Sequence, residues 1–449
     1  MKGTPPALKR VPELTMRKVL VTWWPLAASW LLMGLEGPAI SAVLARLIDP
    51  KINLAAFGGV VFPIALVVEA PIVMLLGAST ALCKDYGAYR RVQSFMRWAA
   101  IALTALHALI VFTPLYGFVV ETLIHAPPEV VGPARIGLAI MTPWTWAIAY
   151  RRFNQGILIR FGHSKAVGAG TAVRLLAGGA ILAVGYSIGS VPGIIVAAVA
   201  MDAGVLAEAA YAWRRVRPVV RERLAPERAG DSVLSLRSFL AFYVPLSLTS
   251  VISLTAIPLG SAAMSRMPNA LESLAAWPVV TGLSFMFRSF GFAYNEVVLA
   301  LVDVPRSMRR LRRFALLVAA ATSVGLLLLM IPALGGLWFR GVTGLPENLA
   351  GIAQRSLWFA VPLPALSVYQ SWLQGMIVHG RRTRGITEAV GLSLLAMVAV
   401  LATGVAWAGT TGLYVGMAAF AIGDTVRTIW LVRRSGPIRA RLWERDVAL

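Results

Sequence analysis

The sequence predicts an all-α polytopic membrane protein with twelve membrane-spanning helices, arranged as two parallel six-helix repeats with both termini in the cytoplasm. Three observations predict this class: an apolar composition with long hydrophobic runs, an alternation of basic and weakly charged loops, and an internal repeat.

The composition identifies the broad class. Of the 449 residues, 58% are hydrophobic and 14% are charged, whereas soluble chains keep roughly a quarter of their residues charged. Apolar runs recur along the chain at the length of about twenty residues that spans a bilayer, and this recurrence disfavours the alternative of a large water-soluble enzyme with buried helices. The expected spans are 19–46, 53–82, 95–118, 131–153, 166–188, 191–212, 240–264, 271–301, 314–335, 350–377, 386–407 and 411–432.

The formal charge of +22 reports topology rather than a nucleic-acid partner. Loops that alternate along the chain are rich in Lys and Arg, as cytoplasmic loops are. The basic loops are 83–94, 151–165, 213–238, 303–313 and 378–385, together with both termini, whereas the opposite loops carry Arg46, Lys51, Arg135, Arg266, Arg340 and Arg355. Both termini are therefore expected in the cytoplasm. The protein is expected to lie in the lipid bilayer of the cell (inner) membrane.

An internal repeat divides the chain into related halves. At a shift of 220 residues, Pro25 meets Pro245, Pro38 meets Pro258 and Arg46 meets Arg266. At a shift of 219, Gln155-Gly156 meets Gln374-Gly375. Because each half has an even number of expected spans, the halves would run the same way through the membrane. The expected domains are an N-terminal lobe (1–213), a cytoplasmic linker (214–238) and a C-terminal lobe (239–449), with a cleft between the lobes.

Prolines inside the spans remove backbone hydrogen bonds, and the freed carbonyls need other partners in lipid. Most such prolines are expected to produce static kinks that serve packing. Pro38 and Pro258 occupy equivalent places in the two halves and are the candidate hinges for opening the cleft.

Eight ionisable side chains are expected at bilayer depth, where each costs about 2.5–3.5 kcal/mol on insertion scales. Groups at that depth normally face a cavity or a partner, so we treat all eight as candidates for substrate or ion binding. They are Glu36, Glu69, Arg174, Asp202, Arg288, Glu296, Asp424 and Arg427.

Two structural pairings compete with a binding role. Asp424 and Arg427 are three residues apart on one helix face, which favours a neutralising intrahelical pair. Arg174 would likewise neutralise Asp202 within the first lobe.

Glu69, Arg288 and Glu36 are expected to be more directly functional. Glu69 and Arg288 are 219 residues apart and would approach the cleft from opposite lobes, where they would meet a substrate or close a gate. Glu36 has the uncharged Ala256 at its repeat position. An unpaired buried carboxylate suits coupling to H⁺ or Na⁺, and a hydrogen-bonded structural carboxyl is the alternative for Glu36.

The sequence contains no pattern typical of an enzyme. A Gly-rich phosphate loop, a cluster of metal-ligating histidines and a Gly-x-Ser-x-Gly nucleophile motif are all missing. Cys83 is the single cysteine, so no disulfide framework or cysteine-based metal site is expected. We expect no catalytic residue, no metal and no cofactor other than a coupling ion.

Four short segments resemble the progressive-ankylosis (ANK) transport proteins, a branch of the multidrug/oligosaccharidyl-lipid/polysaccharide (MOP) exporter superfamily. They spread over about three quarters of the chain. The segments are Gly34-Leu35-Glu36-Gly37; Pro143 with Gly156-Ile157-Leu158-Ile159-Arg160; Pro258 with Ser265-Arg266, Pro278-Val279 and Glu296; and Phe359, Pro362-Leu363-Pro364 and Leu373-Gln374-Gly375 with Arg381-Arg382-Thr383.

The resemblance implies a MATE-like fold and efflux of a small anionic metabolite by alternating access, with Glu36 and Glu296 as the best-matched ionisable positions. Polar residues that surround these sites in the family are largely apolar here, and the eight candidate charges are net acidic, which does not favour an anion. A MATE-like multidrug or cation antiporter and a lipid-linked oligosaccharide flippase therefore stay open as alternatives.

Two further alternatives lie outside that superfamily. Asp85 to Arg91 looks like the Asp-Arg-x-Gly-Arg-Arg signature of major-facilitator transporters, although Tyr86 replaces its first Arg. A membrane-embedded enzyme or scaffold would need a polar triad at one leaflet, which the sequence does not display. The sequence leaves the substrate and the oligomeric state undetermined.

Overall fold

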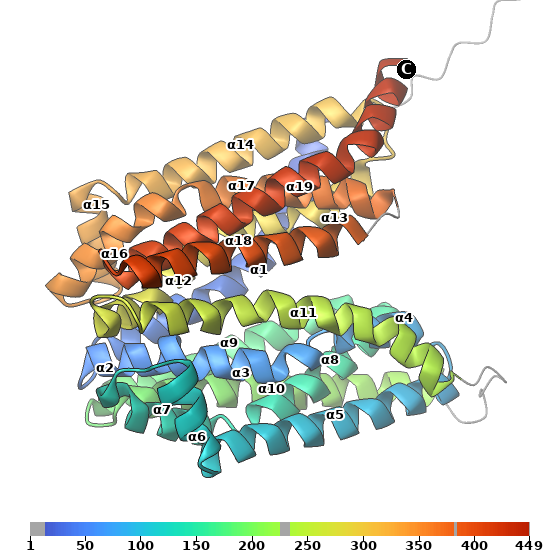
Figure 1. Cartoon of the computed structure of the whole chain (residues 1–449). Coiled ribbons are helices and arrows are strands. Elements are labelled where there is room, and N and C mark those ends of the chain that lie inside the picture. Colours follow the sequence, from blue (N-terminus) through green and yellow to red (C-terminus); the bar gives the residue numbers. More distant parts are fainter. Residues whose placement is uncertain (1–13, 225–233, 381–383, 449) are drawn as a thin grey trace, which may run out of the picture.

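A computed structural model describes residues 14–224, 234–380 and 384–448, and these residues form a bundle of helices without strands (Figure 1). Ten helical segments within this part of the chain are long and apolar enough to cross a membrane. The all-α polytopic class predicted from the composition is therefore confirmed. Eight of the ten are single helices: α1 (Met16–Leu44), α5 (Tyr86–Phe112), α9 (Ser164–Ile188), α10 (Gly193–Arg223), α11 (Leu236–Met264), α14 (Ser307–Leu328), α18 (Arg384–Trp407) and α19 (Gly412–Ala448).

The other two apolar segments are compound. Residues 50–82 run through α2 (Pro50–Leu54), the π-helical segment η1 (Ala55–Val61), α3 (Phe62–Glu69), the 3₁₀ segment η2 (Ala70–Ile72) and α4 (Leu75–Leu82). Residues 270–301 comprise α12 (Ala270–Phe292) and α13 (Tyr294–Leu301).

Proline divides the chain where the fourth and tenth spans are expected. Pro143 precedes α8 (Trp144–Arg160) and ends the connection from α7 (Pro128–Ile140). Likewise Pro362 begins α17 (Pro362–His379), which follows α16 (Glu347–Ala360) after one residue. Because proline lacks an N–H and clashes with the preceding turn, neither pair is one continuous helix. The count of twelve spans stays a prediction.

The order of elements repeats along the chain. α1 and α11 each have 29 residues, and the helices that follow them begin at Pro50 and Ala270. Asp49 and Asn269, which precede those helices, both adopt left-handed backbone with φ values of 49° and 55°. The repeat extends to the short elements α6 (Leu115–Gly117) with η3 (Phe118–Leu123) and α15 (Pro332–Gly336) with η5 (Leu337–Val342).

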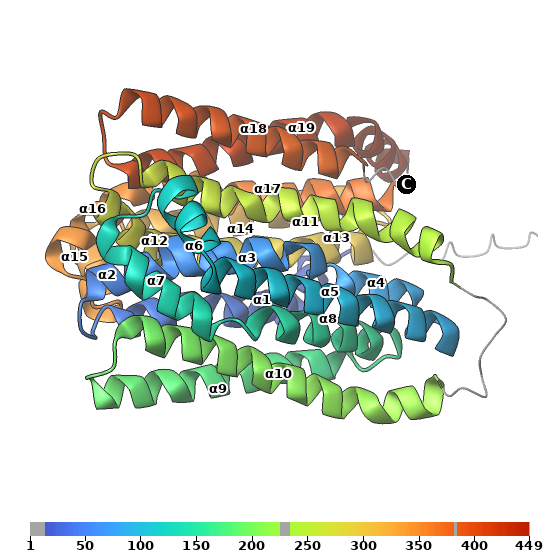
Figure 2. The ribbon, with the colours of Figure 1, turned by 60° about the horizontal axis from the view of Figure 1, so that its bottom comes forward.

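The helices form two bundles that lie side by side (Figures 1 and 2). We call α2–α10 the N-terminal bundle and α12–α19 the C-terminal bundle. One apolar core joins η1, α3, α8 and α10 in the N-terminal bundle and continues into α12 and α16, so it also lines the contact between the bundles. A second core lies among α13, α14, α17 and α19.

α1 and α11 each belong to both bundles. The first half of α1 packs in the C-terminal core, where the Trp23 indole N–H donates to the Phe290 carbonyl at 2.9 Å. The first half of α11 packs on the N-terminal bundle, where the Tyr243 hydroxyl donates to the Pro71 carbonyl at 2.6 Å and its ring contacts Phe95. Farther along, α1 contacts α9 and α10, and α11 contacts α18 and α19. We call α1 and α11 the exchanged helices.

Two repeat-related arginines join the bundles at the end opposite the termini. Arg46 donates to the carbonyls of Gly341 and Val342 at 2.7 and 2.9 Å, which lie at the end of η5. Arg266 donates to the carbonyls of Thr122 and Leu123, both at 2.9 Å, at the end of η3. Each arginine thus binds carbonyls that its neighbouring helix end leaves free.

The bundles also pack closely through η1 and α12. A Cβ atom at Gly58 would lie 2.3 Å from two ring carbons of Pro278, and one at Gly59 would lie 2.9 Å from Leu274. Lys51 and Glu272 form an ion pair of 2.5 Å at the same contact. Glycine is required at Gly58 because only its missing side chain leaves room for the proline ring.

Two expectations about domains change in detail. The linker expected at 214–238 begins inside α10, which continues to Arg223, and α11 starts at Leu236. Its middle, and the basic residues Arg381 and Arg382, lie outside the described residues. The exchanged helices also cross the expected lobe boundary. The hinge role of Pro38 and Pro258 stays a prediction.

Candidate functional site

The N-terminal bundle holds a buried network of charges that begins at Glu36. The Arg174 guanidinium on α9 donates to Glu36 Oε1 at 2.8 Å through Nε and to Oε2 at 2.6 Å. This two-bond geometry gives both orientation and strength. Of the two roles that the sequence left open for Glu36, these contacts fit the hydrogen-bonded carboxyl and not the unpaired one. The predicted pairing of Arg174 with Asp202 is wrong in this structure.

The network continues across α10 to α8. Glu208 is 1% exposed and accepts from Arg151, and the Gln155 amide donates to its Oε1 at 2.8 Å. Arg174 lies 3.9 Å from the same carboxylate. Glu208 thus joins Arg151 and Arg174, which explains why two buried cations are tolerated side by side.

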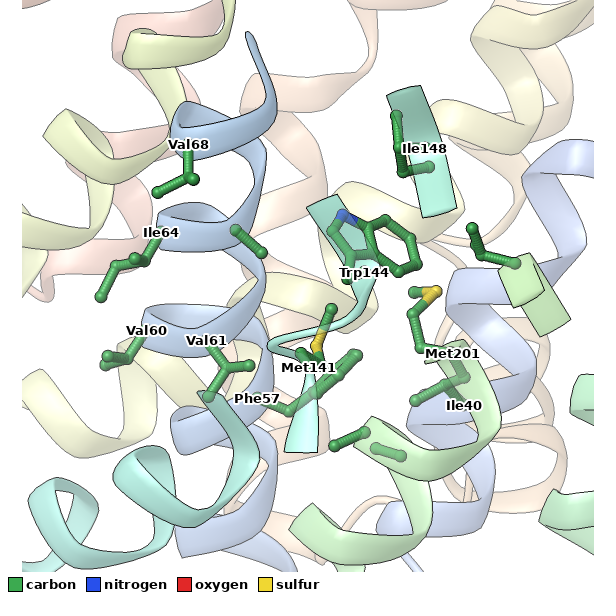
Figure 3. Packing of buried hydrophobic residues seen from close by; sticks show 14 of the residues in the cluster. Ile40, Phe57, Val60, Val61, Ile64, Val68, Met141, Trp144, Ile148 and Met201 are labelled. Carbon is green, nitrogen blue, oxygen red and sulfur yellow. The ribbon is translucent and has the colours of Figure 1, made fainter. Parts of the chain in front are cut away.

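Glu69 lies within the same bundle and not opposite Arg288 in a cleft. The Trp144 indole N–H at the start of α8 donates to Glu69 Oε2 at 2.6 Å, and the Arg174 guanidinium lies 5.7 Å from the Trp144 ring. Figure 3 shows Trp144 packed near Ile148 and Met201. Glu69 and Arg288 thus neither close a gate nor face a common substrate site in this structure, because each binds partners within its own bundle.

Asp202 lies apart from this network. It is 7% exposed, and its Oδ1 has no hydrogen-bond partner within the described residues. No ion pair reaches Asp202 in that part of the chain. A buried carboxylate without a partner is costly to keep, which marks Asp202 as a functional candidate.

The C-terminal bundle holds a cavity of about 140 Å³ between α11, α12, α18 and α19. We call it the C-terminal cavity. The residues that give it polarity are Arg288, Asp424, Arg427, Ser253 and Ser393, and Phe420 contributes an aromatic wall.

The ion pair in this cavity joins two helices. Arg288 on α12 lies 2.7 Å from Asp424 Oδ2 on α19, and its Nε donates to Ser367 Oγ at 2.8 Å. The predicted intrahelical pair of Asp424 with Arg427 is therefore wrong. Arg427 forms no ion pair in the described part of the chain, and its buried Nε has no hydrogen-bond partner there. Two arginines face one aspartate, so the cavity has one positive charge in excess.

Glu296, the remaining candidate, lies on α13 with an exposed side chain. It is not part of either polar cluster, and no ion pair involves it among the described residues. The structure therefore gives no geometric support for the role in substrate or ion binding that the family resemblance implied for Glu296.

Equivalent positions of the two bundles carry opposite charges. Glu69 corresponds to Arg288 and Glu208 to Arg427, each at a separation of 219 residues. The two bundles therefore offer chemically different sites, one with acidic groups bound by arginines and one with arginines in excess.

Sequence reasoning missed several members of both clusters. Arg151 was assigned to a cytoplasmic loop, yet α8 continues to Arg160 and buries it. Glu208 lay within an expected span, and its repeat relation to Arg427 was the available signal. Gln155 stood out only through the repeated Gln-Gly pair. No group of three or more His, Cys, Asp or Glu side chains suited to a metal ion occurs within the described residues.

No protein-family model and no curated protein sequence matches this chain. Solved structures do match its fold over nearly the whole chain. One is an inward-facing MATE multidrug transporter of the MOP superfamily, with a TM-score of 0.66 and 15% identity over 94% of this chain and 99% of the other.

Two further structures give similar values. A MOP superfamily transporter from Pyrococcus furiosus, described as having a binding pocket of reversed polarity, has a TM-score of 0.63 and 17% identity over 98% of this chain and 99% of the other. The lipid II flippase MurJ in an inward closed conformation has a TM-score of 0.63 and 13% identity over 94% and 90% of the two chains. The major-facilitator alternative is therefore wrong, and the chain has the fold of the MATE transporters.

Proposed function

We propose that this chain is a secondary active transporter of the MOP superfamily, in its progressive-ankylosis branch, that exports a small anionic metabolite. The substrate bears phosphate or carboxylate groups, and the two bundles alternate in exposing it to the two sides of the cell (inner) membrane. The fold shared with MATE transporters and MurJ supports the transporter class. The basic loops that alternate along the chain support cytoplasmic termini.

The observation that carries the choice of an anion is Arg427 in the C-terminal cavity, which forms no ion pair with any residue that the structure describes. Two arginines and one aspartate line this cavity, and Asp424 is already paired with Arg288. A phosphate or carboxylate entering the cavity would accept hydrogen bonds from Arg427 and from the hydroxyl of Ser393, because the Ser253 hydroxyl already donates to the Thr249 carbonyl. Arginine is well suited to this task because its planar donors match both anions.

Coupling to H⁺ or Na⁺ is assigned to Asp202 in place of Glu36. Glu36 is held by Arg174 in the described structure, so protonating it would break an ion pair. Asp202 is buried with an unpartnered oxygen and can bind a proton or a sodium ion without such a loss.

A MATE-like cation antiporter is the second candidate. The N-terminal bundle buries Glu69, Asp202 and Glu208 and holds the partly buried Glu36, against the arginines Arg151, Arg152 and Arg174. The four acids exceed the three arginines by one negative charge, which would favour a cation. The excess positive charge of the C-terminal cavity favours an anion instead. A lipid-linked oligosaccharide flippase stays open through the likeness to MurJ.

Metabolite profiling of cells that overproduce the protein distinguishes these functions. We expect a phosphate- or carboxylate-bearing compound to fall inside the cells and rise in the medium. Arg427→Gln should reduce this export by about 10- to 100-fold, the range expected for losing a charged hydrogen bond. Arg433→Gln is the matched control, because Arg433 is an exposed arginine on the same helix.

Three outcomes would contradict the anion proposal. Export of organic cations with unchanged anion levels would favour the antiporter. Accumulation of a lipid-linked sugar on one leaflet of the membrane, in cells that produce the Arg427→Gln variant, would favour the flippase. Anion export that survives Arg427→Gln at wild-type rate would place the binding site elsewhere.

A further inference from the structure

A second polar cavity lies near the two chain ends, away from the clusters described above. Its volume is about 630 Å³, and it is lined by Arg306, Arg309, Arg310 and Arg313 of the α14 region and by Trp443 and Val447 of α19. Leu14, at the start of the described chain, also borders it. We call it the terminal cavity.

The end of α19 is fastened to the start of α14, which gives the terminal cavity a fixed wall. Asp446 Oδ2 accepts from the Met308 N–H at 2.8 Å. Arg445 donates to the Val302 carbonyl at 2.9 Å and to Asp446 Oδ1 at 2.6 Å. The Asp446 carboxylate is thus already bound by a neighbouring guanidinium and a helix N–H.

The remaining charge of the cavity is strongly positive. Arg309, Arg310 and Arg313 form no ion pair within the described part of the chain, and Asp446 is the one acid that lines the cavity. Arginines gathered without acidic partners repel one another unless an anion lies between them. Their planar guanidinium groups favour phosphate oxygens, which they bind through paired hydrogen bonds.

Apolar surface continues from these arginines along α14. Arg309, Arg313 and Leu317 follow one another at four-residue spacing, so they lie on one helix face. Leu316 and Leu317 are both 54% exposed, and Trp443 is 39% exposed beside the arginines. A ligand that fits this surface has an anionic head and an apolar tail, as a membrane phospholipid does.

We propose that the terminal cavity binds the headgroup of an anionic phospholipid, with the acyl chains lying along Leu316 and Leu317. The headgroup phosphate lies among Arg309, Arg310 and Arg313, and the indole of Trp443 lies at the glycerol level, where tryptophan is favoured. The bound lipid ties the start of α14 to the end of α19. The terminal cavity shares no lining residue with the C-terminal cavity.

The repeat provides a matched control for testing the proposal. Arg90 and Arg91 are exposed at the start of α5 and correspond to Arg309 and Arg310 at a separation of 219 residues. R309Q/R310Q and R90Q/R91Q therefore remove the same charge from equivalent places of the two halves. Only the first variant alters residues that line the terminal cavity.

Native mass spectrometry of the purified full-length protein then measures binding of phosphatidylglycerol and phosphatidylcholine. Wild type should bind one phosphatidylglycerol about tenfold more tightly than phosphatidylcholine, in line with the attraction that each arginine adds near a membrane surface. R309Q/R310Q should lose this preference and R90Q/R91Q should keep it. Equal binding of the two lipids to wild type, or equal losses in the two variants, would overturn the proposal.

Glycerol 3-phosphate is the soluble probe that separates a lipid from a free phosphate. If it displaces phosphatidylglycerol at equal concentration, the site serves a soluble anion and the lipid proposal fails. A second measurement does not depend on the arginine variants folding. Brominated phosphatidylglycerol should quench wild-type tryptophan fluorescence more than that of W443F, whereas brominated phosphatidylcholine should show no such difference; equal quenching by both would also overturn the proposal.

Discussion

At the scale of single residues, the buried carboxylates differ in the partner that each one binds. Glu36 and Glu208 meet arginines, Glu69 meets an indole N–H, and Asp202 keeps an unpartnered oxygen. Breaking a buried ion pair leaves an uncompensated charge, whereas neutralising an unpaired acid does not. Glu36 and Asp202 should therefore respond differently to the loss of their charge.

We predict that Glu36→Gln destabilises the protein and that Asp202→Asn does not. The Arg174 and Glu36 side chains are 13% and 17% exposed, so the loss should stay below the about 3–5 kcal/mol found for fully buried pairs. Thermal unfolding in detergent measures the stability of both variants. Asp202→Asn should instead abolish the dependence of transport on pH or sodium. Asp202→Asn transport with an unchanged pH profile and an unchanged sodium response would exclude Asp202 as the coupling site.

These pairings mark the limit of what the sequence could predict at this scale. All eight candidate charges were identified from their depth in apolar runs, but the observed partners of Glu36, Arg288 and Glu69 come from other helices. Arg174 and Glu36 are 138 residues apart, and Arg288 and Asp424 lie on helices at opposite ends of the C-terminal half. Spacing along one helix predicts only neighbours within that helix, which is why Arg427 was paired wrongly.

At the scale of elements, the contact between η1 and α12 depends on the absence of side chains. Gly58 lies against the ring of Pro278, and the two positions belong to repeat-related segments of the chain. Side chains added there must displace backbone or ring atoms, since neither can rotate away.

We predict that Gly58→Ala lowers the free energy of unfolding by about 1–3 kcal/mol, the usual range for overpacking. Gly179→Ala on α9 is the control, because a Cβ there meets nothing within 4 Å. Alanine in place of an exposed helical glycine stabilises by about 1 kcal/mol at most. The midpoint of thermal unfolding measures both changes. A Gly58→Ala midpoint equal to that of Gly179→Ala would show that the two segments separate easily.

The sequence predicted the elements better than their breaks. Hydrophobic runs located six of the ten long apolar segments to within four residues at both ends, whereas α5 and α14 begin nine and seven residues earlier than expected. The repeat located equivalent ends, such as Pro50 and Ala270. Pro143 and Pro362 were read as prolines within spans, whereas they begin or precede new helices. A proline within an apolar run can kink a helix or end it, and the packing of the surrounding helices decides which of the two occurs.

At the scale of the whole molecule, the distribution of basic residues predicts the orientation in the membrane. Arg312 and Glu129 are both exposed and lie near the starts of α14 and α7, which are at opposite ends of the bundle (Figure 1). Cys83 is fully buried, and burial raises the pKa of its thiol to about 12. Since the thiolate is the reactive form and the label must reach the sulfur, we expect the buried Cys83 to react little with it.

We predict that a membrane-impermeant maleimide labels Glu129→Cys in intact cells and does not label Arg312→Cys. Inverted membrane vesicles should give the reverse pattern, and the wild-type protein should remain unlabelled in both. Labelling of Arg312→Cys from outside would mean that the basic loops face the exterior.

The exchanged helices have a consequence for how the molecule is made. Trp23 is 267 residues from its partner Phe290, so the first helix leaves the ribosome long before the chain that receives it. During that interval the first half of α1 lacks the helices of the C-terminal core against which it packs in the folded protein. The N-terminal bundle is likewise incomplete until Tyr243 has been synthesised, 172 residues after its partner Pro71. Neither half is thus a finished unit during synthesis, and the native arrangement closes only when the second half has been inserted.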